Sequence, residues 1–432
     1  MADQSLPPTT QSRQRTAVPS ELAGSPTGAY RLSRALVLLF FASTVDVVNF
    51  LDRGNQFRYA ILLIPIGVAA SIWVRSGTTY IRRLRAVDRP LLLLWLFGMA
   101  GTIYGTVVLH SSTTARPIFL PMAIGFLYLF VPDRPTEDEV WRLVKAIALI
   151  GALYIVLGAA VNTQLIPGLL KYRQFRNAQF ASVTVGLAGA AFLRRRTRLI
   201  GLIVLAAFNF LAYPSATSIL ATMGMLITLF VTRPNASSMR PYVVGLVIAF
   251  GILVALLNLP AEIAILNDYF SFVHKVNANY GRLSVWSQGI AQFASSPFIG
   301  RVFSGGTVAV ATRLRAGSQI QIPYHNDYVL FLAEGGLVGF GLLVAWIAGL
   351  ELTLLRGYRG FLQANMQAHA TAMRLLLVGL NSFLVAAAFN PVMEGMSRSA
   401  TIFGFYGVAM MLGRPPKEVA LARVGTRDRA PP

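Results

Sequence analysis

Long apolar runs, each ended by a short polar segment, repeat along most of this 432-residue sequence. A helix needs about 20 apolar residues to cross roughly 30 Å of hydrocarbon. By this measure the sequence predicts an all-α integral membrane protein with about 12 transmembrane helices. The candidate spans are residues 34–51, 59–75, 90–109, 117–132, 143–161, 180–193, 199–213, 215–232, 242–259, 326–355, 375–389 and 398–413. The pair of runs around Pro214 is also compatible with one kinked helix, which changes the count by about one.

Three polar stretches flank or interrupt this membrane domain, which we place at residues 34–413. Residues 1–33 are rich in Pro, Ser, Thr and Gln and lack the apolar core of a signal peptide, so they predict a disordered cytoplasmic tail. Residues 414–432 predict a second cytoplasmic tail. Residues 260–325 form the one long segment between predicted spans, and loops of that length are usually functional or disordered.

The long loop has a helical pattern of its own. Leu283, Trp286, Ile290 and Phe293 recur at the spacing of one helix face. They predict a short amphipathic helix that lies against the membrane domain through this face. The alternative is a solvated helix without such a contact.

The composition agrees with the apolar pattern. The chain is 55% hydrophobic and only 13% charged, with a mean hydropathy of +0.59, whereas soluble domains average about 25% charged residues. The formal net charge of +21 is divided among short clusters between apolar runs, which is typical of membrane topology signals and not of a nucleic-acid-binding face. The absence of cysteine excludes disulfides and thiolate metal sites.

The basic clusters also predict an orientation, because cytoplasmic loops of membrane proteins carry an excess of Lys and Arg. With both termini in the cytoplasm, about two-thirds of the 38 Lys and Arg residues fall on the cytoplasmic side of the predicted map. Residues 260–325 then lie on the external face.

Basic residues are nevertheless numerous on the predicted external face, where few carboxylates accompany them. They are Arg53, Arg58, Arg116, Lys171, Arg173, Arg176, Lys275, Arg282, Arg301, Arg313, Arg315 and Arg398. Such an excess favours an anionic ligand held by charge-assisted contacts, and membrane-embedded diphosphate lipids are the matching class. The alternative is pairing with anionic lipid headgroups, which would account for part of the charge.

His325 stands at the start of the tenth predicted span. The positive end of a helix dipole favours a neutral imidazole, and such an imidazole at a water-exposed membrane edge is a candidate general base. A plain polar anchor is the alternative. Glu334 lies nine residues further on the opposite helix face, about 13 Å deeper, so it meets His325 only if the glycines after it break the helix. Close packing against a neighbouring span is predicted for Gly335, Gly336, Gly339 and Gly341.

Two segments carry motifs in a fixed order. YGRLSVWSQGIAQFASSPFIGRVFSGG, residues 280–306, combines a Gly-Arg pair, a Trp and Ser-Pro-x-x-Gly. HNDYVLFLAEGGLVGFGLL, residues 325–343, combines a His-Asn pair with Glu-x-Gly-x-x-Gly. By these motifs and their spacing the chain resembles the O-antigen ligase/polymerase family of bacterial envelope glycan enzymes. The likeness in predicted architecture covers nearly the whole chain.

The resemblance implies a glycosyltransferase that uses an undecaprenyl-diphosphate-linked glycan at the periplasmic face of the bacterial inner membrane. Arg282 matches the family's loop arginine, thought to hold the donor diphosphate, and His325 matches the histidine thought to activate the acceptor hydroxyl. The fold would be that of lipid-dependent membrane glycosyltransferases, and the reaction one inverting displacement without metal or other cofactor. The implied partners are a glycan or lipid A–core acceptor, membrane lipids and other envelope polysaccharide assembly proteins, with no nucleic acid.

The sequence departs from the family pattern at one place. Ala216 stands where a second family arginine, in a Ser-Arg pattern, is expected. A neighbouring cation would have to replace it. Arg173 and Arg176 are the best candidates, and Lys171 lies beside them.

Four further residues are predicted to contact the substrate: Trp286, Asn326, Asp327 and Glu394. Asn326 and Asp327 lie at a predicted helix start, so shaping that start is their alternative role. Glu394 has an i,i+4 pair with Arg398 as its alternative.

Other functions stay open. Within the family, a polymerase joins lipid-linked repeat units and a ligase moves the finished chain onto lipid A–core; Ser-x-Thr-Ser at residues 215–218 slightly favours a polymerase. A transporter or flippase is a different class, although no internal repeat is evident and the polar residues gather at one face. A metal-dependent enzyme with Asp46 and Asp52 as ligands is the third, and added chelator would abolish its activity.

Overall fold

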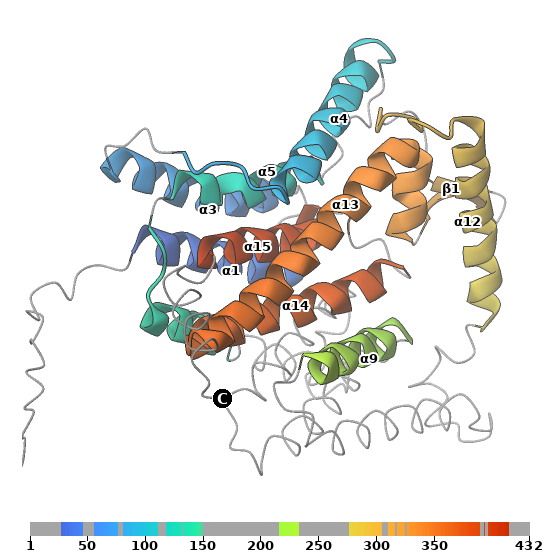
Figure 1. Ribbon diagram of the computed structural model, residues 1–432. Helices are drawn as coiled ribbons and strands as arrows, with labels where there is room; N and C mark the ends of the chain where they lie inside the picture. The colour runs from blue at the N-terminus through green and yellow to red at the C-terminus, as the bar shows by residue number, and fades with distance from the viewer. Residues whose placement is uncertain are drawn as a thin grey trace, which may run out of the picture.

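The structure, a computed structural model, describes residues 27–45, 56–76, 81–110, 118–131, 133–147, 149, 216–232, 276–304, 310–315, 318–324, 326–388, 393 and 396–413. Within these residues the chain is predominantly helical (Figure 1). The helices are α1 (Gly28–Val45), α3 (Gln56–Ser76), α4 (Asp88–Val107), α5 (Phe119–Gly125), the 3₁₀ helix η2 (Phe126–Phe130), α9 (Ala216–Val231), α12 (Val276–Ser295), α13 (Asp327–Gln363), α14 (Gln367–Ala387) and α15 (Met396–Leu412). Residues 137–147 are also helical.

One short β-hairpin is present beside the helices that the sequence predicted. Strands β1 (Val310–Arg315) and β2 (Ser318–Pro323) pair antiparallel within the predicted loop 260–325. Arg315 pairs with Ser318 beside the turn. Polar and apolar residues alternate in β2, as suits a hairpin strand. A search for apolar runs long enough to span a membrane does not detect so short a pattern.

Three helices in the described part of the chain, α4, α13 and α14, are long and apolar enough to cross a membrane. Shorter apolar helices cover Ile61–Ser76, Phe119–Phe130 and Ser399–Leu412. These helices are compatible with a membrane protein. The count of about 12 spans stays a prediction, because several predicted spans lie outside the described residues.

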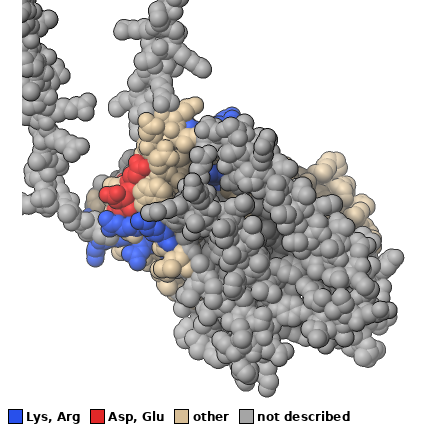
Figure 2. Space-filling view, turned by 90° about the horizontal axis from the view of Figure 1, so that it is seen from below, with Lys and Arg blue, Asp and Glu red and all other residues tan. Residues whose placement is uncertain are grey.

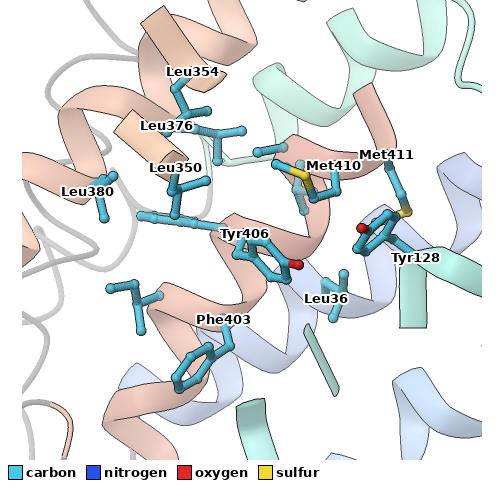
Figure 3. Close-up of a cluster of buried hydrophobic side chains, with 14 of the residues drawn as sticks. Leu36, Tyr128, Leu350, Leu354, Leu376, Leu380, Phe403, Tyr406, Met410 and Met411 are labelled. Atoms are coloured by element: carbon cyan, nitrogen blue, oxygen red, sulfur yellow. The ribbon is translucent and has the colours of Figure 1, made fainter. Parts of the chain in front are cut away.

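The core lies where α1, α13, α14 and α15 pack together, with η2 at its edge (Figure 3). Trp346 of α13 is fully buried at its centre. Its indole stacks on Phe403 with ring centroids 5.4 Å apart and meets Tyr406 edge-on at 5.8 Å. Aromatic side chains bury large areas, so this cluster fixes how α15 lies against α13.

A polar cluster closes one end of this core. The fully buried carboxylate of Asp88, at the start of α4, accepts hydrogen bonds from the hydroxyls of Tyr128 and Tyr406, each at 2.5 Å. It also accepts from the backbone N–H of Arg85. The Arg85 guanidinium donates to the carbonyl of Met410 at 3.0 Å. The cluster therefore joins the start of α4 to η2 and to the end of α15.

The same end of the molecule gathers most of the described basic side chains, and we call it the basic end. Here α1, α4 and α14 begin and α3, α13 and α15 end. The basic residues in or near it are Arg31, Arg34, Arg75, Arg82, Arg83, Arg85, Arg89, Arg134, Arg142, Lys145, Arg356, Arg359 and Arg374. Figure 2 shows Lys and Arg side chains grouped beside Asp and Glu on the described surface seen from below. This alternation of helix directions is compatible with the predicted orientation, in which the basic end is cytoplasmic.

The start of α1 corrects a predicted boundary. Residues 28–33 were expected in a disordered tail, but α1 begins at Gly28, and Leu32 and Ser33 are fully buried. Carboxylates hold this start. Glu139 accepts from the backbone N–H of Thr27 at 2.9 Å and from its hydroxyl at 3.0 Å, and Asp133 accepts from the N–H of Ala29. Carboxylates are favourable at a helix start, because its first N–H groups lack partners within the helix and the dipole is positive there. A hydropathy pattern cannot predict this contact, because the acids come from a distant part of the sequence.

We expect the carboxylate of Glu139 to make a pH-dependent contribution to the free energy of unfolding. Burial alone would raise the pKa of its carboxyl, but hydrogen bonds from the N–H groups of Thr136 and Thr27, and from the Thr27 hydroxyl, lower the pKa below its ordinary value. The contribution is therefore complete above the pKa of an unfolded glutamate, about 4.3, and is lost as the pH falls through the lower folded value. We expect Glu139→Gln to cost about 1 kcal/mol near pH 7 and less in acid.

Thermal unfolding of the detergent-purified protein over a pH series checks this expectation. The matched control is Asp138→Asn, since Asp138 is an exposed neighbour on the same helix turn. An equal loss of stability from both variants at neutral pH would contradict the assigned role of Glu139.

Candidate functional site

At the end opposite the basic end, α12 packs along the first turns of α13 (Figure 1). The buried cluster between them consists of Val285, Tyr324, Val329, Leu330 and Ala333, with the half-buried Trp286 against it. The Gln292 amide joins both sides: its nitrogen donates to the Ala333 carbonyl at 3.3 Å, and its oxygen accepts from the Tyr324 hydroxyl at 2.7 Å. The amphipathic helix predicted in the long loop therefore exists and contacts the membrane domain.

The face that α12 uses overlaps the predicted one only in part, because Trp286 packs against the cluster and Ile290 does not. Ile290 was expected in the contact and is 55% exposed. Val285, Gly289 and Gln292 face α13 instead. The prediction was wrong for Ile290 because Gly289 allows the helices to approach closely and Gln292 hydrogen-bonds across the contact. An apolar periodicity counts neither effect.

Helix α13 is broken at Gly336, whose φ and ψ are 58° and −159°. A break frees backbone groups that need partners, and the segment after α12 supplies them. The N–H of Leu337 donates to the carbonyl of Pro297 at 2.8 Å, and the N–H of Val338 donates to that of Phe298 at 3.0 Å. In return, the N–H of Phe303 donates to the carbonyl of Glu334 at 3.1 Å. Residues 297–304, which we call the docking loop, thus complete the broken helix.

Two glycines make this joint possible. Gly300 has a φ of 57°, and a Cβ on it would lie 2.6 Å from the Gly336 nitrogen. A Cβ on Gly336 would lie 2.5 Å from the Phe298 carbonyl oxygen. Both positions therefore need glycine for the backbone angle and for the space. The Ser-Pro-x-x-Gly and Glu-x-Gly-x-x-Gly motifs are the two halves of one joint.

Helix α4 forms the other wall of the docking loop. A Cβ at Gly101 would overlap the carbonyl oxygen of Val302, and one at Gly105 would overlap that of Ser304. Phe303 is buried at 2% exposure, and its ring has edge contacts with three aromatic rings: Phe97 at 6.0 Å, Phe119 at 5.6 Å and Phe331 at 5.5 Å. The loop is therefore held between α4 and the break in α13.

Val302 and Phe303 have left-handed backbone angles, with φ of 55° at each. Such angles cost non-glycine residues about 1–3 kcal/mol and persist only where surrounding contacts enforce them. The buried Phe303 ring and the close wall of α4 are those contacts.

The start of α13 is fixed by the two residues after His325. The Asn326 side-chain oxygen accepts from the N–H groups of Tyr328 at 3.0 Å and Val329 at 3.2 Å, as a helix N-cap. The fully buried Asp327 accepts from the N–H of Met393 at 2.8 Å. Helix shaping, the alternative role that the sequence gave, is therefore present at Asn326, whereas the bond of Asp327 ties this start to the segment before α15. Their predicted substrate contacts stay predictions.

Of the remaining predicted site residues, two lie in α12 and the others lie outside the described residues. Trp286 lies against the α12–α13 cluster, and its buried indole N–H has no hydrogen-bond partner in the described part of the protein. Arg282 lies within α12, and its side chain is not among those described. The others, His325, Lys171, Arg173, Arg176 and Glu394, lie outside the described residues. The structure thus joins the motif segments without testing their catalytic roles.

The break at Gly336 does not bring Glu334 closer to the start of α13. Glu334 is fully buried, and the break lies after it, so the helix is intact from Asp327 to Glu334. The glycine break that the sequence allowed is real, but it serves the docking loop. Gly339 also packs on the loop, against Phe303, whereas Gly341 has open space around it.

Sequence reasoning missed the contribution of α4. Gly98, Gly101 and Gly105 recur on one face of a predicted span, which is a known signal for close backbone approach. That signal identifies a contact surface, but it does not say that a loop, and not another helix, occupies it.

Comparison of the sequence with models of known protein families finds no match, and comparison with curated proteins finds no significant match. Among the described residues, no group of three or more His, Asp or Glu could hold a metal ion. Metal independence stays a prediction.

Proposed function

We propose that this chain is a membrane glycosyltransferase of the O-antigen ligase/polymerase type. It would transfer an undecaprenyl-diphosphate-linked glycan to a saccharide hydroxyl at the periplasmic face of the bacterial inner membrane. The observation that carries the proposal is the packing of residues 285–304 against residues 326–339, through Gln292, Gly300 and Gly336. These residues belong to the two segments whose motifs resemble the family, and a shared active site requires that they meet.

In the proposed reaction the acceptor hydroxyl gives its proton to His325 while its oxygen bonds to the anomeric carbon of the donor. The bond from that carbon to the diphosphate oxygen breaks with its electron pair, so the configuration inverts and undecaprenyl diphosphate leaves. Arg282 neutralises the leaving diphosphate. The cluster of Lys171, Arg173 and Arg176 is proposed to supply the charge of the missing family arginine.

The described scaffold supports this reaction by holding backbone positions rigid. The Asn326 cap and the buried Asp327 fix the first turn of α13, next to the proposed base. Gln292 fixes α12 against the same segment. A site built on helices locked by packing and hydrogen bonds keeps its reacting groups in place, which is where much of the catalytic gain of a two-substrate reaction arises.

The test is surface-glycan analysis of a deletion strain complemented with the wild type, His325→Ala or Arg282→Ala, with membrane expression of each checked. We expect each variant to lose polymeric glycan, by about 100-fold or more in transfer rate for the missing base. Short lipid-linked units accumulate if the enzyme is a polymerase, and long lipid-linked chains accumulate if it is a ligase.

The matched control is His110→Asn, because His110 is an exposed histidine with a φ of 47° that asparagine tolerates. It should leave the glycan unchanged. Normal glycan from His325→Ala would contradict the assignment of His325 as the general base. Normal glycan from both site variants would favour a transporter.

A further inference from the structure

The docking loop has an apolar tip that nothing in the described protein covers. Phe298 is 70% exposed and Ile299 is 48% exposed. In an aqueous loop, two such neighbours would present a large apolar surface to water, which is unfavourable.

The tip lies beside helices long enough to span a membrane. The carbonyls of Pro297 and Phe298 accept from the N–H groups of Leu337 and Val338 in α13. The following residues lie against Gly101 and Gly105, within the last two turns of α4. Both α4 and α13 are candidate spans, so the loop lies at a level that the spans themselves occupy.

The outward surface of both spans is apolar at this level. Leu337 and Val338 of α13 are exposed, and so are Ile103 and Val107 of α4. In each helix only 28% of the most apolar window is buried inside the protein. The loop tip therefore continues a surface that a membrane-spanning helix presents to lipid.

The backbone of the loop also meets the condition for membrane depth. Irregular backbone is tolerated there only where its polar groups have partners within the protein. The loop N–H groups of Gly300, Val302, Phe303 and Ser304 donate to the carbonyls of Ser296, Ile299, Glu334 and Arg301 respectively. The loop can thus leave water without unpaired donors at these positions.

We propose that the docking loop is a re-entrant, lipid-bound segment, with Phe298 and Ile299 inserted among the acyl chains of the leaflet opposite the basic end. Helix α12 is assigned to water, because its exposed face carries Ser287, Gln288 and Ser295 beside the apolar Ile290. The inference rests on the packing of the loop against two candidate spans and is independent of the glycosyl-transfer proposal.

The absence of cysteine from the chain permits a direct test. Phe298→Cys is spin-labelled in the full-length protein and reconstituted into phosphatidylcholine–phosphatidylglycerol vesicles. Collision rates of the label are measured with oxygen, which concentrates in hydrocarbon, and with a water-soluble nickel chelate. Val338→Cys on α13 is the lipid reference, and Gln288→Cys on α12 is the water reference.

We expect the oxygen-to-nickel ratio at position 298 to match that of Val338→Cys and to exceed that of Gln288→Cys severalfold. A ratio equal to that of Gln288→Cys overturns the proposal. Low access to both reagents, with dipolar broadening between labels, also overturns it, because a second copy of the chain would then cover the tip. If Phe298→Cys does not fold, the same measurement at Ile299→Cys decides, with the same outcomes.

Discussion

Replacing Gly101 by alanine is expected to prevent the docking loop from seating between α4 and α13. The new Cβ would overlap the carbonyl oxygen of Val302. This neighbour is backbone, so no side-chain rotation relieves the clash. Either α4 moves away from the loop or the loop leaves its place, and both remove the buried Phe303 from its ring of aromatic contacts. A loss of this kind exceeds about 4 kcal/mol, which is large compared with the stability of most proteins.

The matched control is Gly67→Ala in α3, where a Cβ would meet nothing within 4 Å. In a helix, alanine is more favourable than glycine by up to about 1 kcal/mol, so this variant should be as stable as the wild type or more stable. Size-exclusion profiles and melting temperatures of the detergent-purified variants make the comparison. Equal melting temperatures for Gly101→Ala and wild type would mean that the loop is not seated against α4.

Local patterns predicted the described helices well where length and apolar content suffice. The predicted spans 90–109 and 215–232 correspond to α4 at Asp88–Val107 and α9 at Ala216–Val231. The predicted span 326–355 corresponds to α13, but the helix continues to Gln363. Hydropathy ends a span where the residues become polar, whereas a helix continues as long as its backbone bonds are made.

The parts that sequence could not predict depend on contacts between distant segments. A glycine such as Gly336 shows that a helix can break, but the break persists because Pro297 and Phe298 accept the hydrogen bonds of the freed N–H groups. Likewise, the rotation of α12 follows from Gln292 and its partners, and not from apolar spacing. The candidate site shows the same limit: its motif segments pack together, while the family resemblance and the role of His325 stay predictions.

Replacing Asp88 by alanine is the second change with a large expected effect. It removes the common acceptor of three donors, the hydroxyls of Tyr128 and Tyr406 and the N–H of Arg85. Each buried donor left without a partner costs about 1–3 kcal/mol, and the loss of one member of a buried charged cluster costs about 3–5 kcal/mol in total. The expected result is a large fall in melting temperature, with separation of the start of α4 from the end of α15.

Tyr406→Phe separates this cluster from a simple loss of volume. It removes one hydroxyl but keeps the ring that contacts Trp346, and Asp88 retains its bonds from Tyr128 and Arg85. We expect it to cost about 1 kcal/mol. Combined with Asp88→Ala, it should add almost nothing, because the hydroxyl has already lost its acceptor. Additive losses in this double-mutant cycle, measured by thermal unfolding, would show that the carboxylate and the Tyr406 hydroxyl act independently, contrary to the hydrogen bond between them.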